Sequence, residues 1–214
     1  MRKSFGVINM IVEFLGVSGS GKTTVAKKLK SEWENAGIKV VWDTYELYAN
    51  HGWLTRNLRK AGRIMVFSLS HPRWIVSIYS FIRHKIRKTD DFFIPLFNGI
   101  YLKSILDSAK TNSQIHIFDE GPLQWLWGIK LREKSEVKQE DVKKIYKMFD
   151  YRSRIYVIET DPSTIESRLL NRNKETRILE EENIRNAIVE MIKIQEQIVE
   201  FAREYSEILD IDNN

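Results

Sequence analysis

The sequence predicts one α/β domain with a parallel β-sheet. Short apolar runs rich in β-branched residues alternate with longer helix-forming segments along the 214 residues. Near the N-terminus, an apolar run (residues 11–15), a glycine-rich turn, a helical segment (22–35) and a second apolar run (38–42) follow one another. A strand, a crossover helix and a second strand in this order form a βαβ unit, and such units build parallel sheets.

The glycine-rich turn fits a phosphate-binding loop. Residues 16–24, Gly-Val-Ser-Gly-Ser-Gly-Lys-Thr-Thr, match the pattern G-x-x-x-x-G-K-[ST]. Glycines let the backbone N–H groups approach phosphate oxygens, and the N-terminus of the following helix adds its dipole. Lys22 supplies a mobile charge for the β- and γ-phosphates, and the Thr23 hydroxyl is a ligand for Mg²⁺. The residues expected to bind the nucleotide are Gly16, Ser18, Gly19, Ser20, Gly21, Lys22, Thr23 and Thr24. A chance match is the alternative, but the strand before the loop and the helix after it favour a nucleoside triphosphate site.

The remaining elements follow from hydrophobic periodicity and from helix-capping and turn residues. The helix at 22–35, which Gly37 ends, is followed by a strand at 38–42 and by two or three helices between Glu46 and Asp90, with a break near His71–Pro72. The expected elements in the middle of the chain are a helix at 98–110, a strand at 115–119, a partly helical segment at 123–132 and a helix at 137–150. The last ones are a strand at 154–159, a helix that Asp161 caps and Pro162 begins, a helix from about 179 to 204, and a strand at 208–211.

Composition restricts the class of protein. The chain has no cysteine, which excludes disulfides and thiolate metal sites and suits a reducing cytoplasm. Residues 1–5 lack the features of a signal peptide, and the apolar runs at 6–17 and 74–79 are too short to span a bilayer. We therefore expect a cytoplasmic globular protein with a formal charge of +5.

Positive charge and aromatic residues concentrate between Glu46 and Asp90. No Asp or Glu lies between these two positions, but nine Lys or Arg residues do: Arg56, Arg59, Lys60, Arg63, Arg73, Arg83, Lys85, Arg87 and Lys88. The apolar runs at 64–67 and 74–79 favour helices buried against the sheet. A membrane-surface helix and a nucleic-acid binding segment are the alternatives.

Two acids follow the third predicted strand. Asp119 comes directly after the apolar run at 115–118, where a magnesium-binding acid stands beside a phosphate loop. The alternative is that Asp119 is only a cap or turn residue before Gly121. Glu120 would orient water in a hydrolase or contact the acceptor in a kinase, and otherwise it is a solvated acid.

Three arginines follow the fourth predicted strand. Arg168 and Arg172 are four residues apart, hence on one helical face, and Arg177 follows across a polar loop. Guanidinium groups that close over phosphates stabilise the charge of a transferring phosphoryl group. A solvated basic helix end is the alternative, but the position after the fourth strand of a phosphate-loop protein favours catalysis.

The order of these features resembles the nucleoside and nucleotide kinases, with thymidylate kinase nearest in outline. The resemblance covers essentially the whole chain and implies a three-layer P-loop NTPase fold with strand order 2-3-1-4-5. It also implies a substrate-binding helical region at about 44–110 and a lid at about 172–180. Asp43, after the second strand, matches the acid that handles or orients the acceptor hydroxyl. Glu120 stands where thymidylate and deoxynucleoside kinases carry an arginine, so the chain departs from them at the acceptor site.

These observations predict an ATP- and Mg²⁺-dependent kinase in one domain, residues 1–214. The expected catalytic residues are Lys22, Asp43, Glu120, Arg168, Arg172 and Arg177, and the expected metal ligands are Thr23 and Asp119. The unopposed positive charge predicts an anionic acceptor, such as a nucleoside monophosphate, with Arg56 and Arg59 as anion ligands. A nucleoside triphosphatase that works with a partner is the main alternative. Nucleic acid, a membrane surface and a second copy in a homodimer are further partners that the sequence leaves open.

Overall fold

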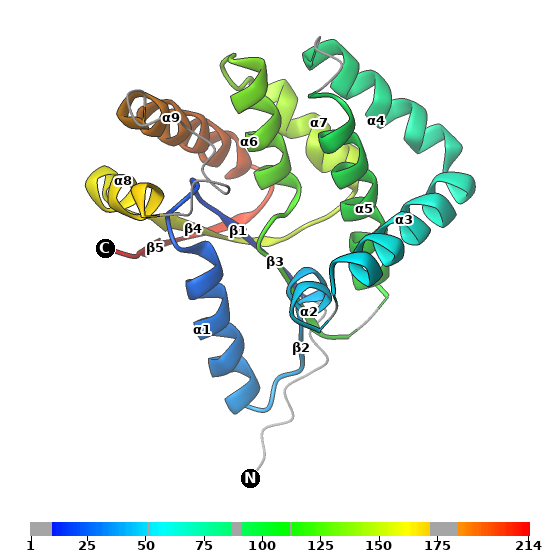
Figure 1. The fold of residues 1–214 in the computed structure, drawn as a ribbon, viewed down its shortest axis with the longest axis horizontal. Helices are drawn as coiled ribbons and strands as arrows, with labels where there is room; N and C mark the ends of the chain where they lie inside the picture. Colours follow the sequence, from blue (N-terminus) through cyan, green and yellow to red (C-terminus); the bar gives the residue numbers. More distant parts are fainter. Residues whose placement is uncertain (1–9, 51, 87–90, 112, 172–183) are drawn as a thin grey trace.

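A five-stranded parallel sheet forms the centre of the protein (Figure 1). The computed structural model describes residues 10–50, 52–86, 91–111, 113–171 and 184–214. The strands are β1 (Met10–Leu15), β2 (Val40–Val41), β3 (Ile115–Phe118), β4 (Arg154–Glu159) and β5 (Glu207–Asp212). Their order is β2-β3-β1-β4-β5, and every neighbouring pair is parallel. The predicted fold class and strand order are confirmed.

Helices cover both faces of the sheet (Figure 1). The helices of the described residues are α1 (Lys22–Asn35), α2 (Asp43–Asn50), α3 (Trp53–Ser70), α4 (Pro72–Lys85), α5 (Phe93–Ala109), α6 (Pro122–Glu133), α7 (Gln139–Phe149), α8 (Pro162–Leu170) and α9 (Ile184–Ala202). On one face, Val25 and Ala26 of α1 pack against Val12 and Phe14 of β1. On the opposite face, α4 to α7 and α9 form the larger core.

Most predicted elements agree with the structure, and several details differ. β2 ends at Val41, because the Trp42 carbonyl already accepts the first hydrogen bond of α2, from the Glu46 N–H (3.0 Å). α5 begins at Phe93 rather than near residue 98, and its proline lies in the first turn, where no intrahelical N–H is required. Asp161 occupies the N-cap position of α8 without a side-chain capping hydrogen bond. The described part of the predicted helix at 179–204 begins at residue 184.

Helix α3 differs most from its prediction. Among the residues of α3 only Phe67 is buried, so the expectation of helices buried against the sheet is wrong for this segment. The apolar side chains of Leu54, Leu58 and Met65 are exposed. Periodicity predicts an amphipathic helix but not which of its faces meets the protein. None of the described helices combines the length and the hydropathy that crossing a membrane requires.

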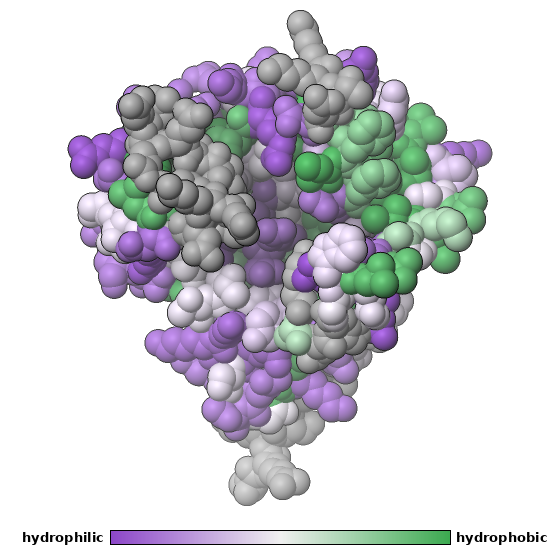
Figure 2. Space-filling model, in the orientation of Figure 1, coloured by the Kyte–Doolittle hydropathy of each residue, from purple (hydrophilic) through white to green (hydrophobic). Residues whose placement is uncertain are grey.

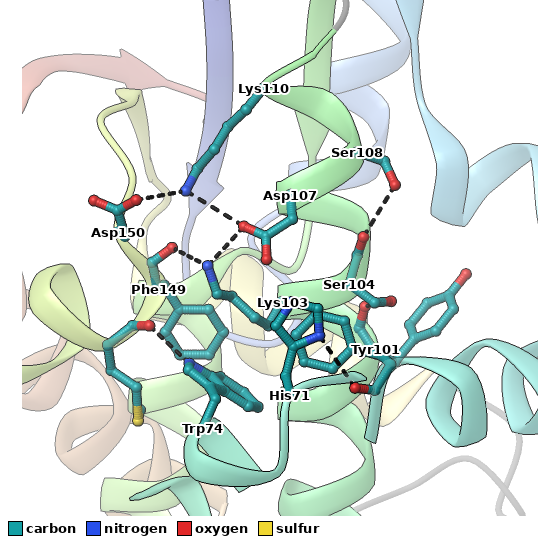
Figure 3. Close-up of polar contacts among 12 residues, drawn as sticks. His71, Trp74, Tyr101, Lys103, Ser104, Asp107, Ser108, Lys110, Phe149 and Asp150 are labelled. Carbon is teal, nitrogen blue, oxygen red and sulfur yellow. Dashed lines mark hydrogen bonds and ion pairs between the residues drawn. The ribbon is translucent and has the colours of Figure 1, made fainter. Parts of the chain in front are cut away.

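Polar contacts fix α4 and α5 against the end of α7 (Figure 3). The buried Lys103 of α5 donates to Asp107 Oδ1 (2.6 Å) and to the Phe149 carbonyl (3.1 Å). Burial lowers the pKa of Lys103, and the Asp107 carboxylate opposes that shift. Trp74 Nε1 of α4 donates to the Met148 carbonyl (2.8 Å). Because α4 follows α3 directly, these contacts also fix the C-terminal end of α3.

Candidate active site

The turn between β1 and α1 has the backbone of a phosphate-binding loop. Gly19 and Gly21 both have a φ of +89°, in the left-handed region that residues with a Cβ rarely adopt. A Cβ on Gly16 would lie 2.6 Å from Ser20 Oγ and 3.1 Å from Lys22 Cγ. Ser20 Oγ is buried and has no hydrogen-bond partner among the described residues. A tight turn that encloses an unpartnered hydroxyl fits a bound phosphate group.

The outer side of the loop is held by residues from the C-terminal part of the chain. The Ser20 carbonyl accepts hydrogen bonds from Thr160 Oγ1 (3.0 Å), Asn213 Nδ2 (2.6 Å) and Arg168 Nη1 (3.2 Å). Because the C=O and N–H groups of a planar trans peptide point in opposite directions, the Gly21 N–H points away from these three donors. Arg168 therefore contacts the loop itself. Arg172 and Arg177 lie outside the described residues.

The charged and hydroxyl side chains of the loop lie at the start of α1. Lys22 Nζ donates to the Gly16 carbonyl (2.7 Å) and to the Val17 carbonyl (3.2 Å), so the ammonium group lies over the loop. Thr23 and Thr24 are exposed in the first turn of α1. The lysine is thus positioned beside the helix N-terminus, where an anion is stabilised.

Asp119 follows β3 and is fixed by the segment after β2. Its Oδ1 atom accepts hydrogen bonds from Trp42 Nε1 (3.0 Å) and Thr44 Oγ1 (2.9 Å). Asp43, the half-buried first residue of α2, stands between these two donors in the chain. Because β1 and β3 are parallel neighbours, the residues that follow them lie at the same edge of the sheet as the loop. The structure therefore brings Asp43 and Asp119 together at this edge.

Glu120 lies at the same edge and is influenced by two lysines. Although its side chain is exposed, the surrounding protein atoms raise the pKa of the Glu120 carboxyl, and Asp119 raises it further, whereas Lys22 and Lys60 lower it. Lys60 of α3, whose ammonium group lies over the Tyr101 ring of α5 (5.1 Å), acts on this carboxyl through its charge. Lys60 is not among the predicted site residues, because its spacing on α3 does not distinguish it from the other basic residues of the segment.

A buried carboxylate below the loop is also missing from the predicted site. Glu13 Oε1 accepts hydrogen bonds from the N–H groups of Leu123 (2.7 Å) and Gln124 (3.1 Å), and its Oε2 accepts one from Tyr151 OH (3.0 Å). Gln124 Oε1 in turn accepts the Gly16 N–H (3.1 Å). Burial raises the pKa of Glu13 to about 7, although the three hydrogen bonds lower it. Glu13 thus fixes the N-terminus of α6, and Gln124 of α6 fixes the loop through the Gly16 N–H. The sequence signal that could have pointed to Glu13 is a single acid inside an otherwise apolar strand.

The two predicted anion ligands differ in their burial on α3. At about 100° per residue, Arg56 shares a face with Lys60, whereas Arg59 lies about 100° from Lys60. Arg56 and Lys60 are half-buried, and Arg59 is exposed. Arg56 therefore lies nearer than Arg59 to the side of α3 that carries Lys60.

Several other basic residues of this segment serve structural contacts. Arg63 Nε donates to Ser104 Oγ of α5 (3.1 Å), and Lys85 pairs with Asp141 Oδ1 of α7 (2.7 Å). Arg73 and Arg83 are exposed on α4, and residues 87 and 88 lie outside the described ranges. The described basic residues between Glu46 and Asp90 therefore lie in several different environments and do not all gather at one site.

Thr23 and Asp119 offer the oxygen donors that magnesium prefers. Within the described residues, no group of three or more His, Cys, Asp or Glu side chains could hold a metal ion. Mg²⁺ at a nucleotide site needs only one or two protein oxygens beside phosphate and water oxygens. A hydroxyl from the loop and a carboxylate from the same sheet edge fit that requirement.

The five-stranded parallel sheet, its strand order and the helices around it are those of the fold of the P-loop nucleoside and nucleotide kinases. Deoxyadenosine kinase from M. mycoides, solved with dCMP and a flexible dCDP, matches with a TM-score of 0.52 and 15% identity over 95% of this chain and 90% of that chain. The same enzyme with bound dCTP gives a TM-score of 0.47 at 14% identity over the same shares of the two chains. Thymidylate kinase from Ehrlichia chaffeensis gives a TM-score of 0.38 at 14% identity, over 96% of this chain and 87% of that chain. The likeness in fold rests on the first of these. No sequence profile of a protein family matches the chain, and no curated protein sequence does.

Proposed function

We propose that this protein is an ATP-dependent phosphotransferase that moves the γ-phosphate to a small anionic acceptor, such as a nucleotide or another phosphorylated metabolite. The observation that carries the proposal is the loop at the start of α1, with Lys22 over it and with Asp119 and Glu120 at the end of the neighbouring strand. The fold shared with deoxyadenosine kinase supports the same chemistry.

The residues have distinct expected roles. Lys22 is expected to leave the loop carbonyls and contact the β- and γ-phosphates, while the loop N–H groups orient them. Asp43 is expected to orient the acceptor hydroxyl. Arg168 supports the loop through its carbonyls, and Arg172 and Arg177 are expected to close over the transferring phosphate. When bound through Thr23 and Asp119, Mg²⁺ would neutralise phosphate charge.

A transfer assay tests the function directly. The purified protein is incubated with γ-labelled ATP, Mg²⁺ and a panel of nucleosides, nucleoside monophosphates and other phosphorylated metabolites. Label transferred to one class of acceptor identifies the kinase and its substrate. Release of labelled phosphate without transfer to any acceptor would contradict the proposal.

Arg56→Ala is expected to raise the KM for the acceptor about tenfold, because a charge-assisted hydrogen bond contributes about 1.5–3 kcal/mol. Arg59→Ala, on the same helix but exposed where Arg56 is half-buried, is the matched control and is expected to change KM less than twofold. Increasing ionic strength should also raise the KM of the wild-type protein for the acceptor, as steady-state kinetics would measure. Efficient phosphorylation of a neutral acceptor at any salt, with both arginines dispensable, would disprove an anionic acceptor.

A nucleoside triphosphatase is the second candidate, and Glu120 favours it. The raised pKa of this exposed carboxyl beside Lys22 suits a group that accepts a proton from water or orients it. For a kinase we expect slow ATP hydrolysis without acceptor, and we expect Glu120→Gln to change that background rate only slightly. Rapid acceptor-independent hydrolysis that Glu120→Gln stops would identify a hydrolase instead. Phosphate release measured for both proteins decides between them.

A further inference from the structure

Two donors from one short segment hold the carboxylate of Asp119. Trp42 Nε1 (3.0 Å) and Thr44 Oγ1 (2.9 Å) both donate to the same oxygen, Oδ1. Each oxygen of an ionised carboxyl group has about two acceptor sites, so these two donors occupy Oδ1. Among the described residues, no donor and no cation contacts the other oxygen, Oδ2. Asp119 therefore presents one oxygen that is held and one that stays available.

Trp42 is a rigid anchor for this contact. Its side chain is fully buried and belongs to the smaller core cluster, together with Ala26 of α1. Its ring stacks on the Tyr45 ring, with the centroids 4.6 Å apart, and Lys27 Nζ of α1 lies over the Tyr45 ring (4.9 Å). Because a close-packed interior holds a large side chain in one rotamer, the Nε1 donor has a fixed position beside Asp119.

The same anchor connects the two elements that carry the expected metal ligands. Thr23 lies in the first turn of α1, and Asp119 follows β3. Helix α1 shares the smaller core cluster with Trp42, and Trp42 donates to Asp119. Thr44 adds the second donor from the first turn of α2, where the helix N-terminus stabilises a nearby negative charge. The junction between β2 and α2 thus sets the position of Asp119 relative to the helix of the loop.

Asp119 lies in surroundings that water can reach. Its side chain is half-buried, and Figure 2 shows a hollow with a hydrophilic floor beside the region of α2. A carboxylate that nothing holds would exchange rotamers here, and a metal ion would have to fix it on binding. Partners that orient a ligating carboxylate therefore raise its affinity for the metal, and their loss typically costs about 10- to 100-fold.

We propose that Trp42 and Thr44 are positioning residues, which hold Asp119 through Oδ1 and leave Oδ2 for Mg²⁺ or for a water bound to it. This role rests on the proposed function, because it requires a nucleotide and Mg²⁺ at the loop. The alternative is a tie between α2 and β3 that serves the fold alone. Such a tie would need neither the negative charge nor the available oxygen, since an amide accepts the same two hydrogen bonds at a lower desolvation cost.

Trp42→Phe and Thr44→Val each remove one donor and keep most of the side chain. The measurement is the affinity for a non-hydrolysable ATP analogue, by calorimetry in EDTA and at increasing Mg²⁺ concentration. In both variants we expect the affinity in EDTA to stay within twofold of the wild type. The Mg²⁺ concentration that gives half of the metal-dependent gain, the Mg²⁺ midpoint, should rise about tenfold. Thr44→Ser keeps the hydroxyl and should retain the wild-type midpoint.

Trp127→Phe is the matched control for the loss of an indole donor. Trp127 Nε1 donates to the Met191 carbonyl of α9 (3.0 Å), in the larger core on the opposite face of the sheet. The control should lower the free energy of unfolding and leave the Mg²⁺ midpoint unchanged. Paramagnetic resonance of Mn²⁺, added with the analogue in place of Mg²⁺, measures the bound metal directly in every variant.

An Asp119→Asn background tests whether the two donors act through the carboxylate. This change should itself raise the Mg²⁺ midpoint, because an amide nitrogen in the place of Oδ2 does not bind the metal. Adding Trp42→Phe to Asp119→Asn should then change the midpoint less than twofold. Circular dichroism verifies the fold, and Thr44→Val at its half-buried position suffices for the test if Trp42→Phe does not fold.

Three results would overturn this role. The first is a Mg²⁺ midpoint that stays at the wild-type value when both donors are removed. The second is a loss of affinity in EDTA as large as the loss in Mg²⁺, which would show a general distortion of the loop. The third is a wild-type protein that binds the analogue equally with and without Mg²⁺. A wild-type protein that binds no analogue at all would instead refute the proposed function, and this role with it.

Discussion

Replacing Lys22 with alanine is expected to lower the rate of phosphoryl transfer roughly 100- to 1,000-fold while the fold stays intact. Removing a preorganised charge contact of this kind costs about three to four kcal/mol of transition-state stabilisation. Lys22 Nζ lies over the loop, within hydrogen-bond distance of the Gly16 and Val17 carbonyls, so few other groups can replace it there. The substitution removes a half-buried side chain at the start of α1 and leaves the glycine turn unchanged.

Lys28→Ala is the matched control, because Lys28 is an exposed lysine of the same helix. It is expected to change the transfer rate less than twofold. Single-turnover measurements with labelled ATP give the rate, and circular dichroism verifies the fold of both variants. Wild-type turnover in a folded Lys22→Ala protein would rule out the loop as the catalytic phosphate site.

The alternation of strands and helices could be predicted because each element carries its own local signal. Residues 11–15 and 155–158 are largely apolar runs of strand length, and Gly37 ends α1 with a φ of +80°. Parallel pairing then follows from crossover helices between the strands. The loop could be predicted because its spacing is itself the structure that binds phosphate.

The surroundings of α3 could not be predicted from the same signals. A helix with an apolar stripe and a basic stripe has the same pattern whether the apolar side faces the core, a membrane or a second chain. In this protein the side with Lys60 and Arg63 meets α5, and the side with Leu58 faces outward. The choice also decides which basic side chains of α3 contact α5, so the sequence could suggest a basic region but not its contacting residues.

The contacts of Glu13 were equally hidden, because they join residues more than one hundred positions apart. Glu13→Ala would leave the N–H groups of Leu123 and Gln124 and the hydroxyl of Tyr151 without their acceptor. Each unsatisfied buried group costs about 1–3 kcal/mol, so the free energy of unfolding should fall by about 3 kcal/mol or more. We also expect weaker ATP binding, since Gln124 is the acceptor for the Gly16 N–H. Urea unfolding and a nucleotide titration measure the two effects, and an Ala variant as stable as the wild type would contradict this role.

Glu13→Gln separates the charge of this group from its hydrogen bonds. The pKa of Glu13 is raised from 4.5 to about 7 in the folded protein, so folding favours the protonated form. Its contribution to stability is therefore fully present below about pH 4.5 and is lost as the pH rises through 7, by about 3 kcal/mol in total. A glutamine accepts the same two N–H bonds and does not ionise. We expect the Gln variant to match the wild type at pH 5 and to be more stable by about 2–3 kcal/mol at pH 8. The difference between the two proteins in urea unfolding at pH 5, 6, 7 and 8 cancels every other titrating group. A difference that does not change with pH would show that Glu13 stays ionised throughout this range.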